Sequence, residues 1–201
     1  MIDIYKYSKK NSLYNFFITK VLNINVDRLT LPFFNKENID LEFNEFFFYD
    51  YCKKHPITKW GGGLESRDCY QSNHDLQKFI DFKKPIKILE NFLNKKIKQT
   101  IFKKNTAGKF KIKSIWYTIQ KKNEGVSMHN HPKSILSGVS YFKIDKDSGG
   151  ELKLHLENKT IEIKPVKNDL IMFNSSAYHS VNSYYGENDR ISVAWDAIYT
   201  L

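Results

Sequence analysis

Hydrophobic and polar residues change to a period of two at about residue 110 and largely keep it to the end of the chain. The pattern covers residues 111–120 (KIKSIWYTIQ) and 134–144 (SILSGVSYFKI). In residues 151–156, leucines at every second position alternate with polar residues. Successive side chains of a strand point to opposite faces, so this pattern predicts strands with one buried and one solvated face.

Turn-forming sequences divide the rest of this half. Two turns, at 157–159 and 165–169, separate predicted strands at 160–164 and 170–173, and the last predicted strand is 190–199 (RISVAWDAIY). Several short strands separated by turns predict a jelly-roll or cupin-like barrel, that is, a double-stranded β-helix. The predicted fold class is mainly β with N-terminal helices (α+β).

The first hundred residues favour helix and loop. Residues 38–54 (NIDLEFNEFFFYDYCKK) are compatible with one amphipathic helix that ends before His55 and its following proline. A second helix is expected to begin near Pro85, since proline suits the first turn. We therefore expect residues 1–105 to form a helical and loop region that packs on a barrel of residues 106–201 and forms one structural domain with it.

Composition bounds the class of protein. The chain has 201 residues, of which 41% are hydrophobic and 15% aromatic, as in a folded globular protein. It has no apolar run of membrane-spanning length and no apolar leader, so we expect no membrane partner and a cytoplasmic location. Cys52 and Cys69 are too few for a disulfide scaffold and are not spaced as a zinc site.

The formal net charge of +10 raises the question of a polyanionic partner. Of the 32 basic residues only Arg28, Arg67 and Arg190 are arginine, however, and arginine is the residue favoured for phosphate and base recognition. A nucleic-acid partner is therefore possible but not favoured. Nothing in the sequence indicates the oligomeric state.

Three of the six histidines are expected to be ordinary surface residues. His55 precedes a proline, His74 stands among polar residues, and His155 lies on the solvated face of its strand.

The other three histidines have the spacing of a metal site. His129 and His131 are two residues apart at the expected start of a strand, so both rings should leave the same face. His179 follows after three predicted strands, and a double-stranded β-helix would bring it back beside the first two. Three side chains on one face of a barrel leave open positions, as in non-haem iron(II) oxygenases.

The last strand adds an anion-binding pair. Arg190 and Ser192 follow His179 and lie on one face of that strand. A guanidinium and a hydroxyl at these positions could bind a carboxylate buried next to the metal.

Several short motifs together resemble the 2-oxoglutarate/Fe(II)-dependent oxygenases related to the prolyl-4-hydroxylase group. They are residues 129–132 (HNHP), 137–141 (SGVSY), 165–169 (PVKND), 179–181 (HSV) and 190–192 (RIS). Residues 69–72 (CYQS), 116–117 (WY) and Gly125 fit its upstream pattern more loosely. The resemblance covers about residues 60–199, and the block from 179 to 192 is its most specific part.

This resemblance implies an enzyme that uses Fe(II), 2-oxoglutarate and O2 to hydroxylate a substrate C–H bond. It implies that His129 and His179 are iron ligands and that Arg190 and Ser192 bind the distal carboxylate of 2-oxoglutarate. Tyr117 or Tyr141 would donate a hydrogen bond to the cosubstrate, and the sequence does not choose between them. The substrate would be a small molecule or a peptide.

One position departs from the family pattern, because His131 stands where these oxygenases usually have a carboxylate. His131 could be the third ligand, giving a neutral three-histidine face, and this is the reading we favour. It could instead be a neighbouring group beside a site with only two protein ligands. In a third reading, Asp145 or Glu151 completes the site.

Two other functions fit part of the pattern. A cupin-type metalloenzyme, such as an isomerase or a thiol dioxygenase, could use the same histidines without 2-oxoglutarate. The glutamate that a typical cupin places shortly after its histidine pair is absent, and such an enzyme has no need of Arg190 and Ser192. A non-catalytic jelly-roll binding module, in which the histidines only satisfy core hydrogen bonds, is the second alternative.

Overall fold

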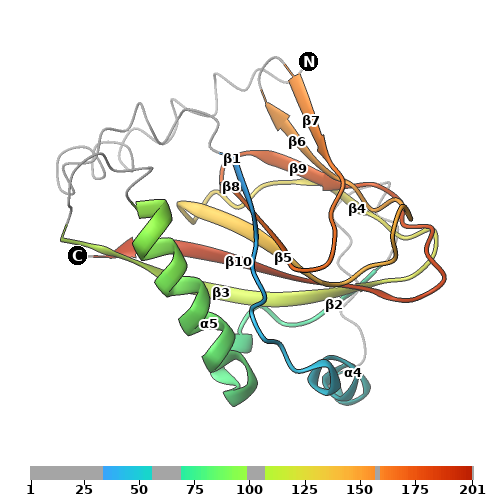
Figure 1. Ribbon diagram of the computed structural model, residues 1–201, viewed down its shortest axis with the longest axis horizontal. Helices are drawn as coiled ribbons and strands as arrows, with labels where there is room; N and C mark the ends of the chain where they lie inside the picture. Colours follow the sequence, from blue (N-terminus) through green and yellow to red (C-terminus); the bar gives the residue numbers. More distant parts are fainter. Residues whose placement is uncertain (1–33, 56–68, 99–106, 157–158, 201) are drawn as a thin grey trace.

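Two antiparallel sheets face each other and form a double-stranded β-helix (Figure 1). The computed structural model describes residues 34–55, 69–98, 107–156 and 159–200. Within these residues the larger sheet has the strand order β1-β8-β5-β10-β3-β2, and the smaller sheet has the order β4-β9-β6-β7. The strands are β1 (Phe34–Asn38), β2 (Tyr70–Gln71), β3 (Lys109–Gln120), β4 (Val126–His129), β5 (Leu136–Lys143), β6 (Leu152–Leu156), β7 (Lys159–Ile163), β8 (Asp169–Asn174), β9 (Tyr178–Val181) and β10 (Arg190–Thr200).

The alternation seen in the sequence gives β6 one buried face. On β6, Leu152 and Leu154 are buried and pack against Tyr141, Ile171 and Phe173 of the opposite sheet. These residues fill one end of the space between the sheets, and the polar positions that alternate with them are more exposed. The predicted mainly β fold with a double-stranded β-helix core is therefore confirmed.

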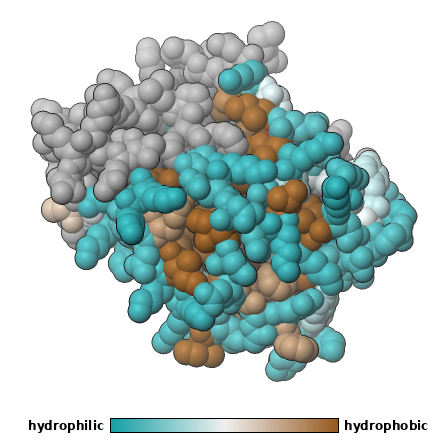
Figure 2. All heavy atoms as spheres, viewed as in Figure 1, coloured by the Kyte–Doolittle hydropathy of each residue, from teal (hydrophilic) through white to brown (hydrophobic). Residues whose placement is uncertain are grey.

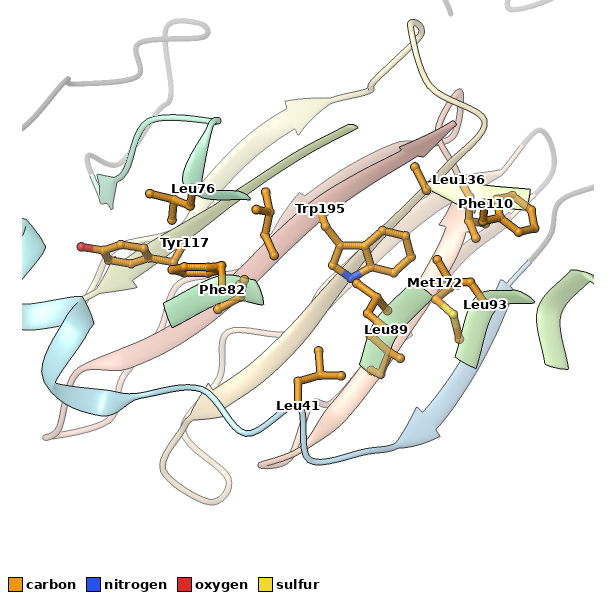
Figure 3. Packing of buried hydrophobic residues seen from close by; sticks show 14 of the residues in the cluster. Leu41, Leu76, Phe82, Leu89, Leu93, Phe110, Tyr117, Leu136, Met172 and Trp195 are labelled. Carbon is orange, nitrogen blue, oxygen red and sulfur yellow. The ribbon is translucent and has the colours of Figure 1, made fainter. Parts of the chain in front are cut away.

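The helices cover the outer face of the larger sheet. Helix α5 (Ile80–Phe92) continues into a π-helical turn, η3 (Leu93–Ile97), and lies across β3 and β10, as Figures 1 and 3 show. The short 3-10 helix η2 (Leu76–Lys78) precedes it, and α4 (Glu45–Lys54) lies near the end of this face. Their apolar side chains surround Trp195, the large central side chain in Figure 3.

Gly138 makes room for this tryptophan. A Cβ at Gly138 would collide with the indole of Trp195 and would lie 2.7 Å from the carbonyl oxygen of Ile171. The absence of a side chain on β5 therefore allows β10 to place a fully buried tryptophan at the centre of the sheet.

The N-terminal part differs from the prediction in two places. Residues 38–54 are not one helix: β1 pairs with β8, and α4 begins only at Glu45, where the side chain of Asn44 accepts a hydrogen bond from the backbone of Phe46. Helix α5 begins at Ile80 rather than near Pro85, which is buried inside it. The region before residue 106 also contributes two edge strands, β1 and β2, to the larger sheet.

The six strands predicted in the second half agree with their observed positions within about two residues, but neither β4 nor β9 was foreseen as a separate strand. Part of the predicted turn at 157–159 lies outside the described residues. Among the described residues, no helix is both long and apolar enough to cross a membrane. On the face shown in Figure 2, hydrophilic side chains predominate, with hydrophobic ones showing between them.

Candidate metal centre and cosubstrate pocket

The register of β4 and β9 brings two of the predicted histidines together. His129 and His179 are directly opposite each other in this antiparallel pair, and their ring centroids are 4.2 Å apart. They are far apart in the sequence, so the contact depends on the crossed connections of the barrel. His129 ends its strand rather than beginning it, which corrects the sequence-based placement.

His131 joins the pair from the turn that follows β4. Its backbone N–H donates to Ser175 O at 2.7 Å, and its ring lies 5.0 Å from that of His129 and 5.2 Å from that of His179. Potential ligand atoms of the three histidines all lie within 4.8 Å of one another. This is the separation expected of ligands that surround one metal ion.

The Nδ1 atom of each ring faces an oxygen. His129 Nδ1 is 2.8 Å from Ser127 O, and His179 Nδ1 is 3.1 Å from Ala177 O. A carbonyl oxygen only accepts, so these contacts require the proton on Nδ1. His131 Nδ1 lies 3.5 Å from Asp196 Oδ2. In this tautomer the lone pair of each neutral ring is on Nε2, the ring atom that can bind a metal.

Burial keeps these rings in the form that binds metal. Loss of hydration lowers the pKa of His129, lowers that of His131 to about 3 and lowers that of His179 well below its usual value. The mutual repulsion that protonated rings would experience acts in the same direction for His131 and His179. The cluster is therefore neutral near pH 7 and complementary to a cation.

The opposite end of the same pocket holds a buried arginine. Arg190 is 1% exposed, and it donates from Nη1 to Gln120 Oε1 and to Ser192 Oγ and from Nη2 to Gly150 O. Among the residues that the structure describes, its Nε has no hydrogen-bond partner. Each of these acceptors is neutral, so the guanidinium charge has none of the carboxylate partners that buried arginines usually have.

Gly150 is fitted to this arginine. It has a φ of +71°, which favours glycine, and a Cβ there would lie 3.1 Å from Arg190 Nε. A side chain at this position would therefore crowd the unpartnered donor.

Tyr141 supplies a second unpartnered donor beside Arg190. The guanidinium carbon lies 4.9 Å from the centre of the Tyr141 ring and interacts with this tyrosine, but among the described residues the buried Tyr141 hydroxyl has no acceptor for its proton. Burial raises the pKa of Tyr141 to about 12, so the hydroxyl keeps its proton. Two buried donors with no acceptor are the signature expected of a pocket for an anionic ligand.

Tyr117, the other tyrosine candidate, is placed elsewhere. Its hydroxyl donates to Phe48 O at 2.7 Å, and its ring packs in the core beneath the helices. Of the two tyrosine candidates, Tyr141 lines the pocket and Tyr117 does not. The β10 hydroxyl of Ser192 does face the pocket, where it lies 2.7 Å from Thr118 Oγ1.

One pocket of about 680 Å³, including its open mouth, joins the two ends. The three histidines line it together with Tyr141, Arg190 and Ser192 as one set. At its mouth the exposed ring of His74 stacks on Trp116 at 4.1 Å, nearly parallel. His74 was expected to be an ordinary surface residue; it is exposed, but it belongs to the pocket wall.

The remaining histidines and acids lie outside the cluster. His55 is exposed and stacks on Tyr51, and His155 bonds to Ser180 on the solvated side of β6. The Asp145 carboxylate accepts from Asn188, and that of Glu151 accepts from Asn182. Neither acid groups with the three histidines among the described residues, so the third reading of the ligand set loses its support.

Asp196, Gln120 and Gly150 contact the site but were missed in the sequence. Asp196 gave one signal: it is the only acid inside an otherwise apolar strand segment, VAWDAIY. Burial raises the pKa of Asp196, and hydrogen bonds from Ser137 and Ser114 oppose that rise. Gln120 and Gly150 carry no signal of this kind.

Comparison with known proteins supports the same assignment. Residues 114–162 match a family model described as "Putative 2OG-Fe(II) oxygenase". A comparison with curated proteins finds no match.

Solved structures share the fold. A 2OG-Fe(II) oxygenase family oxidoreductase from Burkholderia pseudomallei aligns with a TM-score of 0.57 and 16% identity over 92% of this chain and 89% of its own. A prolyl-4-hydroxylase from Pseudomonas putida gives 0.59 and 13% over 89% and 98%. The viral collagen prolyl hydroxylase of Paramecium bursaria Chlorella virus-1, in a 2-oxoglutarate complex, gives 0.58 and 17% over 82% and 96%.

The family match and the solved structures support different conclusions. At these identities the solved structures show the fold, and the family model covers the segment from β3 to β7. Together they confirm the predicted resemblance to the 2OG-Fe(II) oxygenases and point to an enzyme of that class.

Proposed function

We propose that this 2OG-Fe(II) oxygenase holds its metal through His129, His131 and His179 and hydroxylates a C–H bond of a small-molecule or peptide substrate. The observation that carries the proposal is the convergence of three ligand atoms within 4.8 Å, in a pocket whose other end is a buried arginine without a carboxylate partner. The three histidines match the Fe(II) that such an enzyme must bind, and the buried arginine matches its 2-oxoglutarate.

The donor set fits Fe(II). Three neutral imidazoles leave open positions on the metal, and oxygen neighbours at Nδ1 orient each ring. A bound Fe(II) would supply the chemistry by which O2 oxidises 2-oxoglutarate to succinate and CO2 while one oxygen atom enters the substrate. With His131 in the set the protein adds no negative charge at the metal, so the ion keeps more of its positive charge than with a carboxylate ligand.

The arginine end fits the distal carboxylate of 2-oxoglutarate. Arg190 Nε and the Tyr141 hydroxyl are donors without partners, and the Ser192 hydroxyl lies beside them in the pocket. A carboxylate there would satisfy both donors and neutralise the buried guanidinium. This chain's part in the reaction is then to fix the cosubstrate at one end while the histidines hold the metal at the other.

The substrate is proposed to enter beside His74 and Trp116. These rings form part of the open mouth, and Gln71 Nε2 lies 2.6 Å from His74 Nε2 on the same wall. The neighbouring loop before β4 would contribute the rest of this surface. We propose, too, that residues 1–105 and 106–201 act as one structural domain, since the strands of the first part complete the larger sheet.

The alternatives make different demands on the same residues. A cupin-type enzyme without 2-oxoglutarate would need no buried arginine beside an unpartnered tyrosine. A non-catalytic binding module would give no reason for three Nδ1-anchored rings to converge. The arrangement around Arg190 and the arrangement of the rings therefore both favour the oxygenase.

Succinate formation tests this function before a substrate is known. The purified protein with Fe(II), ascorbate and O2 should convert 2-oxoglutarate slowly to succinate, and omission of either the metal or O2 should stop the conversion. Metal-dependent chemistry without 2-oxoglutarate consumption would favour the cupin, and a lack of iron affinity would favour the binding module.

A further inference from the structure

The feature that the proposed function leaves unexplained is a buried acid on β10. Arg190, Ser192, Ala194 and Asp196 occupy alternate positions of this strand, so their side chains share the face that looks toward the smaller sheet. The first three line the pocket, and Asp196 follows them at 7% exposure. A carboxylate inside an apolar strand is costly to bury, so the contacts that hold it are informative.

Two serines hold this carboxylate from the flanking strands. Ser137 on β5 and Ser114 on β3 are the residues directly opposite Asp196 in the two strand pairs. Ser137 Oγ donates to Asp196 Oδ1 at 2.6 Å, and Ser114 Oγ lies 3.4 Å from Asp196 Oδ2. None of these contacts involves a lysine or an arginine.

The second carboxylate oxygen faces a proposed iron ligand. Asp196 Oδ2 lies 3.5 Å from His131 Nδ1. His131 is the one ligand that stands in a turn outside the strands, whereas the rings of His129 and His179 are held by carbonyls two residues before them. Its ring therefore needs an anchor from elsewhere in the fold.

A chain of contacts ties the backbone and the ring of His131 together. Its N–H donates to Ser175 O, Ser175 Oγ lies 2.8 Å from Ser137 Oγ, and Ser137 donates to Asp196. One small polar cluster thus fixes both the turn and the acceptor for the ring.

We infer that Asp196 is a positioning residue that accepts a hydrogen bond from His131 Nδ1–H and directs His131 Nε2 to the metal. The inference rests on the proposed function, because it takes the three histidines as ligands. In this assignment the Asp196 carboxylate does not bind the metal itself. It contacts His131, the histidine that stands where related oxygenases usually have a carboxylate ligand. Such a partner makes the imidazole a better donor than a carbonyl does.

A consequence of this assignment is that one strand serves both ends of the pocket. The start of β10 carries the arginine and serine proposed for the cosubstrate, and Asp196, six residues after Arg190, supports the metal end. The spacing between the two ends is then set by the backbone of a single strand.

The test uses Co(II), the metal alone, as a spectroscopic probe. Asp196→Asn keeps the size of the side chain but removes its charge. We expect it to weaken Co(II) binding about 10–100-fold and to shift the visible Co(II) absorption bands. Asp169→Asn is the matched control, since Asp169 is equally buried but pairs with Lys36 on β1; Co(II) affinity should not change there.

A second comparison asks whether Asp196 acts through His131. In a His131→Ala background, Asp196→Asn should cause no further loss of Co(II) affinity. An additional loss of similar size would overturn the inference, because Asp196 would then act by another route.

The outcomes separate this inference from the proposed function. Wild-type affinity and an unchanged spectrum in Asp196→Asn would overturn the role of Asp196 and leave the metal site intact. If the parent protein binds neither Co(II) nor Fe(II), the proposed function itself fails. Should Asp196→Asn not fold, Ser137→Ala carries the test: it should weaken Co(II) binding only when His131 is present, and an unchanged affinity would count against the inference.

Discussion

The two ends of the pocket differ in how far the protein satisfies its own polar groups. At the histidine end, the Nδ1 atoms of His129, His131 and His179 each face a protein oxygen. At the arginine end, Arg190 Nε and the Tyr141 hydroxyl are buried without a partner. Under the proposed function, the histidine end would therefore be arranged before any ligand arrives, whereas the arginine end would be completed by an anion.

This difference has an energetic meaning. A buried polar group that lacks a hydrogen bond costs about 1–3 kcal/mol. Under the proposed function, the protein would bear this cost at the arginine end in its free state and recover it on binding a carboxylate. The metal end bears no such cost at Nδ1, so its contribution to binding comes from ring orientation. Substitutions at the two ends should therefore affect different ligands.

The largest effect is expected at the histidine end. His179→Ala should abolish Fe(II)-dependent succinate formation, because it removes a ligand from the centre of the cluster. His155→Ala is the matched control, since His155 lies on the neighbouring strand but outside the cluster, and it should retain activity. Iron-dependent turnover in His179→Ala would exclude His179 as a ligand.

The next effect is expected at the arginine end. Arg190→Leu should weaken 2-oxoglutarate binding by about 2–5 kcal/mol, or at least 30-fold, because one partner of a buried charge pair is lost. Fe(II) affinity in the absence of 2-oxoglutarate should stay within about 2-fold of the parent, since Arg190 contacts none of the histidines in the contacts described above. Calorimetric titration of each ligand measures both; unchanged 2-oxoglutarate affinity would contradict the assignment.

The smallest effect distinguishes the two tyrosines. Tyr141→Phe removes an unpartnered hydroxyl, so it should weaken 2-oxoglutarate binding about 10-fold while the ligand-free protein stays as stable or becomes more stable. Tyr117→Phe removes the bond to Phe48 O, so it should lower the free energy of unfolding by about 1 kcal/mol without changing 2-oxoglutarate affinity. Thermal melting and 2-oxoglutarate titration of both variants check these two expectations. Equal changes in stability and affinity in the two variants would contradict different roles for the two tyrosines.

Local pattern was sufficient for most strands of the second half, although not for β4 and β9. Alternating residues defined β6, and the apolar run of β8 marked a strand buried on both sides. The start of α4 was harder: the cap at Asn44 is a local signal that the prediction did not use, and the pairing of β1 with β8 depends on tertiary context. Pro85 misled for the same reason: the buried face that Phe82, Pro85 and Leu89 share outweighs the proline's preference for a first turn.

The candidate site divides along similar lines. His129, His179 and Arg190 could be proposed from residue type and spacing, since each has few chemical alternatives. The choice of Tyr141 over Tyr117 required knowing which side of the larger sheet each faces. Asp196 required the register that places Ser114 and Ser137 opposite it. Local periodicity does not predict contacts between strands that are distant in the sequence.

The central claim is that the two ends of the pocket bind one metal and one cosubstrate together. Anaerobic titration with Fe(II) followed by 2-oxoglutarate tests it most directly. We predict a visible charge-transfer band that appears only when both are present, is lost in His179→Ala and needs more 2-oxoglutarate in Arg190→Leu. Bound Fe(II) with no such band at saturating 2-oxoglutarate would contradict the account.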